Sequence, residues 1–163
     1  CDQIENGVRG VLKEVLMKKL TTQEAEQLIK MLKKTIEKEI HLPSKGTNIR
    51  FDVQGRTKKH IFSISLYRGK INPNKGNFTA LIKRNNTVLL SLDTSSTAKH
   101  MNPDGQIIKG PHWHIYTEEY GRNYAYPAVN ITDSDFVKNT LLFLEEFHVI
   151  EKPKMTEQVS FNL

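Results

Sequence analysis

The feature that most constrains the fold of this chain is a long run of alternating apolar and polar residues in its middle part. Ile49, Phe51 and Val53 are separated by polar residues, and this period of two predicts a strand with one buried face. Asn85-Asn86 favours a tight hairpin, because asparagine tolerates a positive φ. The pattern predicts four neighbouring antiparallel strands, over residues 48–54, 60–66, 78–83 and 87–93.

Apolar residues at helical spacing flank this region. The spacing predicts two helices in the first forty or so residues, the second starting at a capping box of Thr21 and Glu24. The outer face of that helix, which includes Lys33, is expected in solvent. Two further strands are expected over residues 107–117 and 123–130, and Thr132-Asp133-Ser134-Asp135 caps a last helix.

The expected fold class is therefore α+β. It has an N-terminal two-helix hairpin, an antiparallel β-sheet of about five to six strands and a C-terminal helix, with the helices on one face of the sheet. We expect a single domain with a short tail, divided into a helical hairpin over 1–42, a sheet over 48–130 and a helix over 132–148 within the domain 1–152, and a loosely ordered tail over 153–163.

Several protein classes are excluded or disfavoured by composition. No apolar run approaches the ~20 residues that a membrane-spanning helix needs, and no signal peptide is visible. The single cysteine, Cys1, excludes a disulfide scaffold and is either a trimmed start or a lipidation site. No phosphate-binding loop, dinucleotide fingerprint or hydrolase elbow is present. We expect a cytoplasmic protein without membrane association.

Basic residues are concentrated in one block. Residues 45–84 contain ten basic residues and one acidic residue, a net charge of +9, whereas the rest of the chain has 14 basic and 17 acidic residues. Such a surface attracts polyanions. We expect nucleic acid, and RNA in particular, as the partner; the alternative is a basic face with no specific ligand. The predicted nucleic-acid-binding residues are Arg50, Arg56, Lys58, Lys59, His60, Arg68, Lys70 and Lys83.

The segment Gly110–Tyr116 holds the densest group of chemically active side chains. Because side chains alternate across a strand, His112, His114 and Tyr116 are expected on one face. Two such histidines can act as general base and general acid in RNA cleavage, and Tyr116 would orient the scissile group. Arg84 completes the predicted catalytic residues, because an arginine stabilises the charge that develops on a phosphate. This chemistry needs no metal or other cofactor.

The same histidines are also suited to metal binding, because neutral imidazoles are common ligands. The alternative metal site consists of His112 and His114 with His100 and Glu118 as further candidate ligands. An exposed pair of histidines without any ligand is a third interpretation of the strand.

Part of this segment resembles the first metal-binding motif of the cupin family. The resemblance is confined to residues 105–121 and rests on Gly105, His112-Trp113-His114, Glu118 and Gly121. It implies that two histidines and a glutamate bind a metal ion.

A broader resemblance covers the order of the segments. A two-helix start, a basic run of strands and a Gly-x-His-x-His-x-Tyr strand are similar to small uncharacterised proteins of Gram-positive bacteria and their phages. That resemblance implies no activity. Small basic α+β domains with paired His, Arg and Tyr also resemble the ribonuclease toxins of toxin–antitoxin modules, which implies RNA cleavage.

These observations lead to three functional expectations. The first is a basic nucleic-acid-binding protein that acts as a metal-independent, toxin-like ribonuclease. The second is a non-catalytic phage or bacterial accessory or anti-defence factor that binds nucleic acid or protein. The third is a His/Glu metal-binding protein. The N-terminal helical hairpin is in addition a candidate surface for a protein partner or for self-association.

Overall fold

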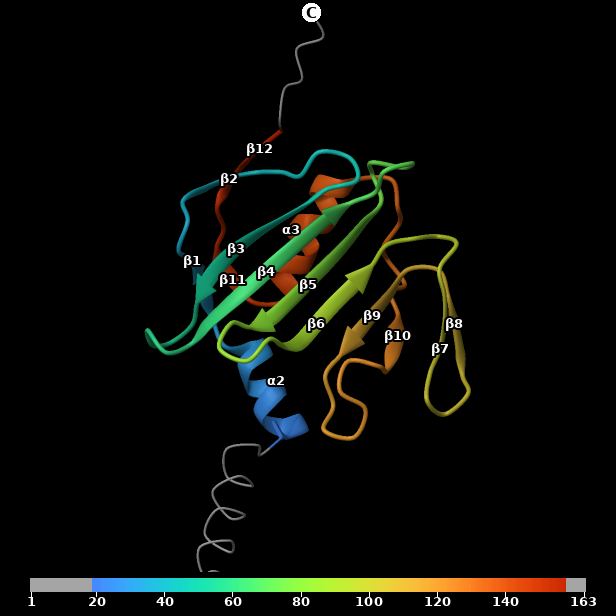
Figure 1. Ribbon diagram of the computed structural model, residues 1–163, viewed down its shortest axis with the longest axis horizontal. Coiled ribbons are helices and arrows are strands. Elements are labelled where there is room, and N and C mark those ends of the chain that lie inside the picture. Colours follow the sequence, from blue (N-terminus) through green and yellow to red (C-terminus); the bar gives the residue numbers. More distant parts are fainter. Residues whose placement is uncertain (1–18, 158–163) are drawn as a thin grey trace, which may run out of the picture.

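The computed structural model describes residues 19–157, and its central element is one large twisted sheet (Figure 1). The strands of this sheet are β1 (Lys33–Thr35), β3 (Asn48–Gln54), β4 (Ile61–Arg68), β5 (Gly76–Ile82), β6 (Thr87–Asp93), β9 (His112–Ile115), β10 (Ala125–Pro127) and β11 (Val149–Glu151). They lie in the order β10-β9-β6-β5-β4-β3-β1-β11. Within this sheet only β1 and β11 pair in parallel, so it is mixed.

Two small sheets and two helices complete the described part of the chain. The small sheets are β2 (Glu39–His41) with β12 (Lys154–Thr156), which pair in parallel, and β7 (Lys99–Met101) with β8 (Ile107–Lys109), which form a hairpin. The helices are α2 (Thr22–Lys30) and α3 (Phe136–Glu146). No helix among residues 19–157 has the length and apolar character needed to cross a bilayer.

Helix α3 covers one face of the sheet, behind β3 to β6 in Figure 1. Phe143 of α3 stacks on Phe78 of β5 at 5.7 Å and on Trp113 of β9 at 6.2 Å between ring centroids. Phe78 also contacts Phe136 at 5.3 Å. Aromatic pairs at these separations contribute beyond the area they bury, so they fix α3 against the central strands.

The opposite face is not covered by any helix of the described residues, as Figure 1 shows. Its side chains are mostly small and polar because the alternating pattern turns the apolar residues towards α3. The register aligns one row of neighbours straight across this open face, in the order Arg50, Ser65, Thr79, Ser91 and His114. The polar surface therefore leads from the exposed Arg50 to the histidine-bearing strand.

The four central strands expected from the alternating pattern are confirmed as β3 to β6, and the capping box at the start of α2 is confirmed as well. The β5–β6 hairpin turns through Asn86, whose φ is 59° and whose N–H donates to Ile82. The expected strand over 107–117 is interrupted at Gly110, where a φ of 82° divides it into β8 and β9.

The expected fold class is wrong in its N-terminal part and in the size of the sheet. Helix α2 ends at Lys30, and the residues expected to continue it form β1 and β2 instead. The first helix of the expected hairpin lies outside the described residues. The main sheet has eight strands rather than five or six, and it is mixed rather than antiparallel. The protein is thus mostly β, with two helices in residues 19–157.

Lys33 explains why the helix stops. Its backbone N–H donates to His148, and its buried amine donates to the carbonyls of Ile29, Met31 and Phe147. A helical continuation would carry this side chain away from those acceptors, so tertiary contacts override the local helix propensity. The expectation that Lys33 faces solvent is therefore wrong.

The chain after Pro153 also differs from the loose tail that we expected. Residues 154–156 form β12 beside β2, and Leu42 N–H donates to Thr156 at 2.8 Å. The partners of β12 lie more than a hundred residues away in sequence, so no local pattern indicates this strand.

Candidate functional site

The topology divides the basic block among three places. The β3–β4 and β5–β6 turns are neighbours, because Lys83 N–H donates to Ile61 at 3.1 Å. The β3–β4 turn carries Arg56, Lys58 and Lys59, and the β5–β6 turn carries Lys83 and Arg84. Arg50 lies on the open face, in the middle of β3. The remaining cations, at the opposite end of the sheet, are Lys45, Arg68, Lys70 and Lys75. The nucleic-acid residues expected from sequence therefore do not form one continuous surface.

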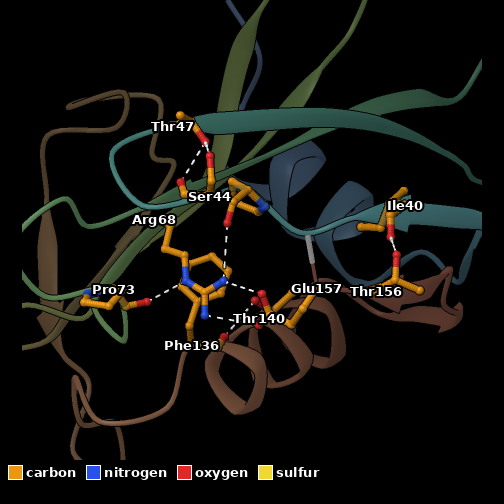
Figure 2. A network of polar contacts seen from close by, with 10 residues as sticks. Ile40, Ser44, Thr47, Arg68, Pro73, Phe136, Thr140, Thr156 and Glu157 are labelled. Atoms are coloured by element: carbon orange, nitrogen blue, oxygen red, sulfur yellow. Dashed lines mark hydrogen bonds and ion pairs between the residues drawn. The ribbon is translucent and has the colours of Figure 1, made fainter. Parts of the chain in front are cut away.

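Arg68 is occupied by protein partners, as Figure 2 shows. Its guanidinium donates to Pro73 O at 2.7 Å and to Pro43 O at 3.3 Å, and it pairs with Glu157 at 2.7 Å. The guanidinium carbon also lies 4.7 Å from the centre of the Phe136 ring. Arg68 thus links β4 to the C-terminal segment and to α3, and few of its donors are left for a ligand.

Lys83 has a partner as well. Its amine pairs with Asp52 on the open face, and Ser63 donates to the same carboxylate at 2.8 Å. Because Asp52 neutralises it, Lys83 contributes less to the field at this end of the sheet than its neighbours do.

The other cations at the end of the sheet formed by the β3–β4 and β5–β6 turns have no ion-pair partner within residues 19–157. Helix α2 lies against the same end. Two hydrogen bonds hold its start: the Tyr116 hydroxyl donates to Leu20 O at 2.8 Å, and Glu118 N–H donates to the Thr22 hydroxyl at 3.0 Å. We call this region the basic end; its members are Lys19, Lys30, Arg56, Lys58, Lys59 and Arg84.

A cleft of about 760 Å³ opens between α2 and the two turns. Its apolar lining consists of Leu20, Leu28, Ile61, Phe62, Ile82 and the Tyr116 ring. Its polar lining consists of Lys19, Glu24, Thr57, Lys59, His60, Arg84, Asn85 and Thr87. We call it the α2 cleft. A second hollow of about 620 Å³ extends it towards Arg56 and Lys30. The two hollows share Leu20, Glu24, Leu28 and His60.

The polar side chains of the α2 cleft differ in whether the protein already uses them. The Tyr116 hydroxyl donates to Leu20, and the Glu24 carboxylate accepts from Thr21 N–H. His60 uses only Nδ1, on Thr57 at 2.9 Å, and Asn85 uses only its oxygen, on Thr87 N–H. The donors left over are the amide nitrogen of Asn85, the amine of Lys59 and the guanidinium of Arg84, and the second oxygen of Glu24 is left over as an acceptor.

The histidine strand β9 carries a second cluster, whose side chains are not part of the α2 cleft lining. The ring centroids of His112 and His114 are 4.9 Å apart, as expected for one strand face. The β7–β8 hairpin adds His100, which lies 4.8 Å from His114 and 5.9 Å from His112. We call these three residues the histidine cluster. Sequence reasoning thus placed the pair on one face and named His100 among several candidates for a third member.

Each imidazole of the histidine cluster is oriented by one backbone carbonyl. These bonds, all 2.8 Å long, join His100 Nε2 to Asn123, His112 Nδ1 to Gly110 and His114 Nδ1 to Arg122. Because a carbonyl only accepts, the bonded nitrogen carries the hydrogen, and the other nitrogen of each neutral ring is an acceptor.

His114 stays neutral well below pH 7. Burial, followed by repulsion from His112, lowers the pKa of His114 to about 4, although the Arg122 carbonyl acts in the opposite direction. His112 is itself buried, with 4% of its surface exposed. A neutral, half-buried imidazole can accept a proton or a hydrogen bond but cannot serve as a general acid at pH 7.

Tyr116, Arg84 and Glu118 do not join the histidine cluster. Strand β9 ends at Ile115, and Tyr116 turns into the core and lines the α2 cleft with Arg84. Glu118 lies in the following loop. Within residues 19–157 no group of three or more His, Cys, Asp or Glu side chains is arranged to hold a metal ion, so the expected metal set with Glu118 is not assembled.

Sequence reasoning missed three residues that contribute to these surfaces. Lys19 and Lys30 join the basic end because α2 packs there, and no sequence signal gives the position of α2. Arg122 lies beside His114, where it disfavours protonation. Arg122 follows the turn closed by the Thr117–Gly121 bridge, and no sequence pattern predicts that this turn brings it beside His114.

Comparisons with known proteins place the chain in a family. A family described as a family of unknown function (DUF6978) matches over residues 20–149. No curated protein and no solved structure matches the chain.

Proposed function

The chain belongs to the DUF6978 family, whose function is unknown, and from its geometry we propose that it binds nucleic acid, RNA in particular, at the basic end. The observation that carries the proposal is the set of cations from two turns and α2 that surround connected hollows without ion-pair partners in the described residues. Unpaired lysines and arginines around a groove attract a phosphate backbone and release its counterions.

RNA is favoured over duplex DNA by the form of the surface. The basic end is hollowed and partly apolar, lined by residues such as Leu28 and Ile82. Single strands expose bases that enter such hollows, whereas a duplex presents mainly its backbone and needs a helix or ribbon that fits its groove. Glu24 of α2 lies at the cleft, so α2 is poorly suited to enter a groove itself.

The test compares two double charge reversals in a binding experiment. Lys58→Glu with Lys59→Glu alters the basic end, and Lys45→Glu with Lys70→Glu makes the same charge change at the opposite end of the sheet. Binding of a fluorescent single-stranded RNA of about 12 nucleotides is followed by anisotropy over a range of salt concentrations.

We expect the first variant to bind at least about tenfold more weakly, with a slope of log affinity against log salt that is flatter by about one or more. The control variant should keep the slope of the wild type. Equal effects of both variants would mean that net charge alone acts, and an unchanged slope in the first variant would contradict the proposal.

RNA cleavage is a second candidate, favoured by the histidine cluster. Its three rings lie within 5.9 Å of each other, and the neutral His114 offers an acceptor nitrogen of the kind that a general base needs. The row of small polar residues on the open face ends at His114. Tyr116 and Arg84 are left out of this version, because they line the α2 cleft.

Cleavage is tested on a gel with labelled RNA in the presence of EDTA. Metal-independent cleavage that disappears in the His112→Ala, His114→Ala double variant, while RNA binding persists, would support it. Intact RNA under conditions where the protein binds it would leave a binding protein, which is the main proposal.

A further inference from the structure

We propose that the α2 cleft holds a single nucleotide of the bound RNA, with the base between α2 and the sheet and the phosphate at Lys59 and Arg84. The inference rests on the proposed function and names the ligand of one part of the same surface. It follows from the size, the divided lining and the unused donors of the cleft.

Size is the first argument. The α2 cleft has a volume of about 760 Å³. Pockets for small molecules and cofactors measure about 300–1,000 Å³, so a nucleotide fits with room for neighbouring phosphates at the mouth. The apolar residues come from α2 and from the ends of β4 and β5, as with Leu28, Phe62 and Ile82. A flat apolar ligand group is suited to a slot with such walls.

The unused donors are the second argument. Lys59, Arg84 and the amide nitrogen of Asn85 have no hydrogen-bond acceptor within residues 19–157. All three come from the two turns, on the sheet side of the cleft. Phosphate offers only acceptors when ionised, and charge-assisted bonds from lysine and arginine are the strong ones.

The combination of the two linings excludes simpler ligands. Inorganic phosphate would leave the apolar walls empty, and a purely apolar ligand would leave the cations without a partner. A nucleotide satisfies both, since bases stack on apolar and aromatic surfaces while the phosphate accepts hydrogen bonds. Glu24 at the α2 side can accept from the exocyclic amine of a base or from a ribose hydroxyl.

The experiment uses the full chain and the same fluorescent RNA as above. Unlabelled AMP, UMP, adenosine, inorganic phosphate and hexyl phosphate are added as competitors. We expect the nucleotides to displace the RNA at least about tenfold more effectively than adenosine or inorganic phosphate do, because only they engage both linings. Displacement by hexyl phosphate that equals AMP would show a general amphiphile site and overturn the nucleotide assignment.

Two variants address the cleft itself. Arg84→Ala removes an exposed guanidinium, and Leu28→Trp fills the space beside the half-buried leucine. Both should lower AMP affinity at least about tenfold, since each removes one of the two interactions. Lys70→Ala at the opposite end is the matched control and should leave AMP affinity unchanged. Because Leu28→Trp can alter packing, Arg84→Ala alone is sufficient to judge the phosphate contact.

The two proposals fail in different ways. If no RNA binds at low salt, the proposed function is wrong and the nucleotide inference falls with it. If RNA binds with the expected salt slope but AMP neither binds nor competes, and Leu28→Trp keeps full RNA affinity, the basic end is a backbone-binding surface. The nucleotide inference is then overturned while the proposed function stands.

Discussion

Lys33 joins the C-terminal ends of both described helices. Its amine donates to Ile29 at 2.9 Å and to Met31 at 2.7 Å, at the end of α2, and to Phe147 at 2.7 Å, at the end of α3. The amine also lies 3.8 Å from the centre of the Phe147 ring. Burial lowers the pKa of Lys33 to about 7. An ammonium has three donors, and here three carbonyls at negative helix ends accept them.

Replacing Lys33 with methionine keeps most of the side-chain volume but removes the amine from these three carbonyls, of which only Ile29 O has a second side-chain partner within residues 19–157, His148 Nδ1 at 3.0 Å. We expect the free energy of unfolding at pH 6 to fall by about 2–4 kcal/mol, because each unpaired buried acceptor costs about 1–3 kcal/mol and the substitution relieves part of that by burying an apolar group. Urea denaturation measures the change. The control is Lys34→Met, which removes an exposed pair with Glu151 and should change stability by less than about 1 kcal/mol. Equal losses in both variants would contradict the role of Lys33.

His114 makes stability depend on pH in the acidic range. Its pKa is about 4 in the folded protein and 6.5 in the reference state, so the unfolded chain binds the proton first. The stability that neutral His114 contributes is therefore fully present above pH 6.5 and is lost as the pH falls towards 4. We expect His114→Gln, which keeps a donor for Arg122 O, to lose less stability over this window than the wild type. NMR titration of the ring should give a midpoint near 4; a midpoint near 6.5 would contradict the burial argument.

The histidine cluster also marks how far residues could be predicted from the sequence. The alternation of side chains along a strand correctly predicted that His112 and His114 lie on one face, because this prediction requires only that both residues belong to one strand. It failed for Tyr116, because β9 ends one residue earlier and the chain then turns into the core. His100 could be named as a candidate, but its approach depends on the β7–β8 hairpin, whose position no periodicity gives.

At the scale of elements, the link made by Arg68 holds three segments together. It joins β4 to the carbonyls of Pro43 and Pro73, to Glu157 after β12 and to the Phe136 ring of α3 (Figure 2). The Arg68 side chain is 14% exposed and that of Glu157 is 51% exposed, so water screens part of the ion pair. Sequence alone assigned Arg68 to RNA because it lies in the basic block.

Arg68→Ala should therefore affect stability and not binding. We expect the free energy of unfolding to fall by about 1–3 kcal/mol, through loss of a bidentate ion pair and of packing on Phe136. RNA affinity below the melting temperature should match that of the wild type within about twofold, whereas Arg84→Ala should show the reverse behaviour. Thermal unfolding and anisotropy on the same samples separate the two. A tenfold loss of affinity in folded Arg68→Ala would contradict this division.

The elements that sequence patterns could not predict share one property. Strands β1, β2, β11 and β12 have three residues each, too few for a period to be recognised, and their partners are distant in the chain. The meander β3 to β6 was predictable because seven or eight residues display the alternation and each strand pairs with its sequence neighbour. The apolar residues Leu32 and Ile36 imitated a helical stripe, although both are more than half exposed.

For the whole molecule, the charge distribution matters more than the net charge of +6. The basic end gathers cations without ion-pair partners in the described residues, whereas Arg68, Lys83 and Lys34 are paired. Unpaired like charges repel each other in the folded state and are farther apart in the unfolded chain. The basic end should therefore destabilise the free protein to some degree, and a bound polyanion should remove that repulsion.

This repulsion predicts opposite responses to salt. Raising NaCl from about 0.02 M to about 0.3 M shortens the screening length from roughly 20 Å to below 10 Å, so the melting temperature of the free protein should rise by a few degrees while RNA affinity falls. In the Lys58→Glu, Lys59→Glu variant both responses should become flatter, because the same charges cause both. In the Lys45→Glu, Lys70→Glu control the affinity should keep its dependence on salt. Differential scanning fluorimetry and anisotropy over one salt series provide the measurements. A wild-type melting temperature that does not change with salt would mean that the cations of the basic end are too far apart to repel, and too far apart to act together on one RNA strand.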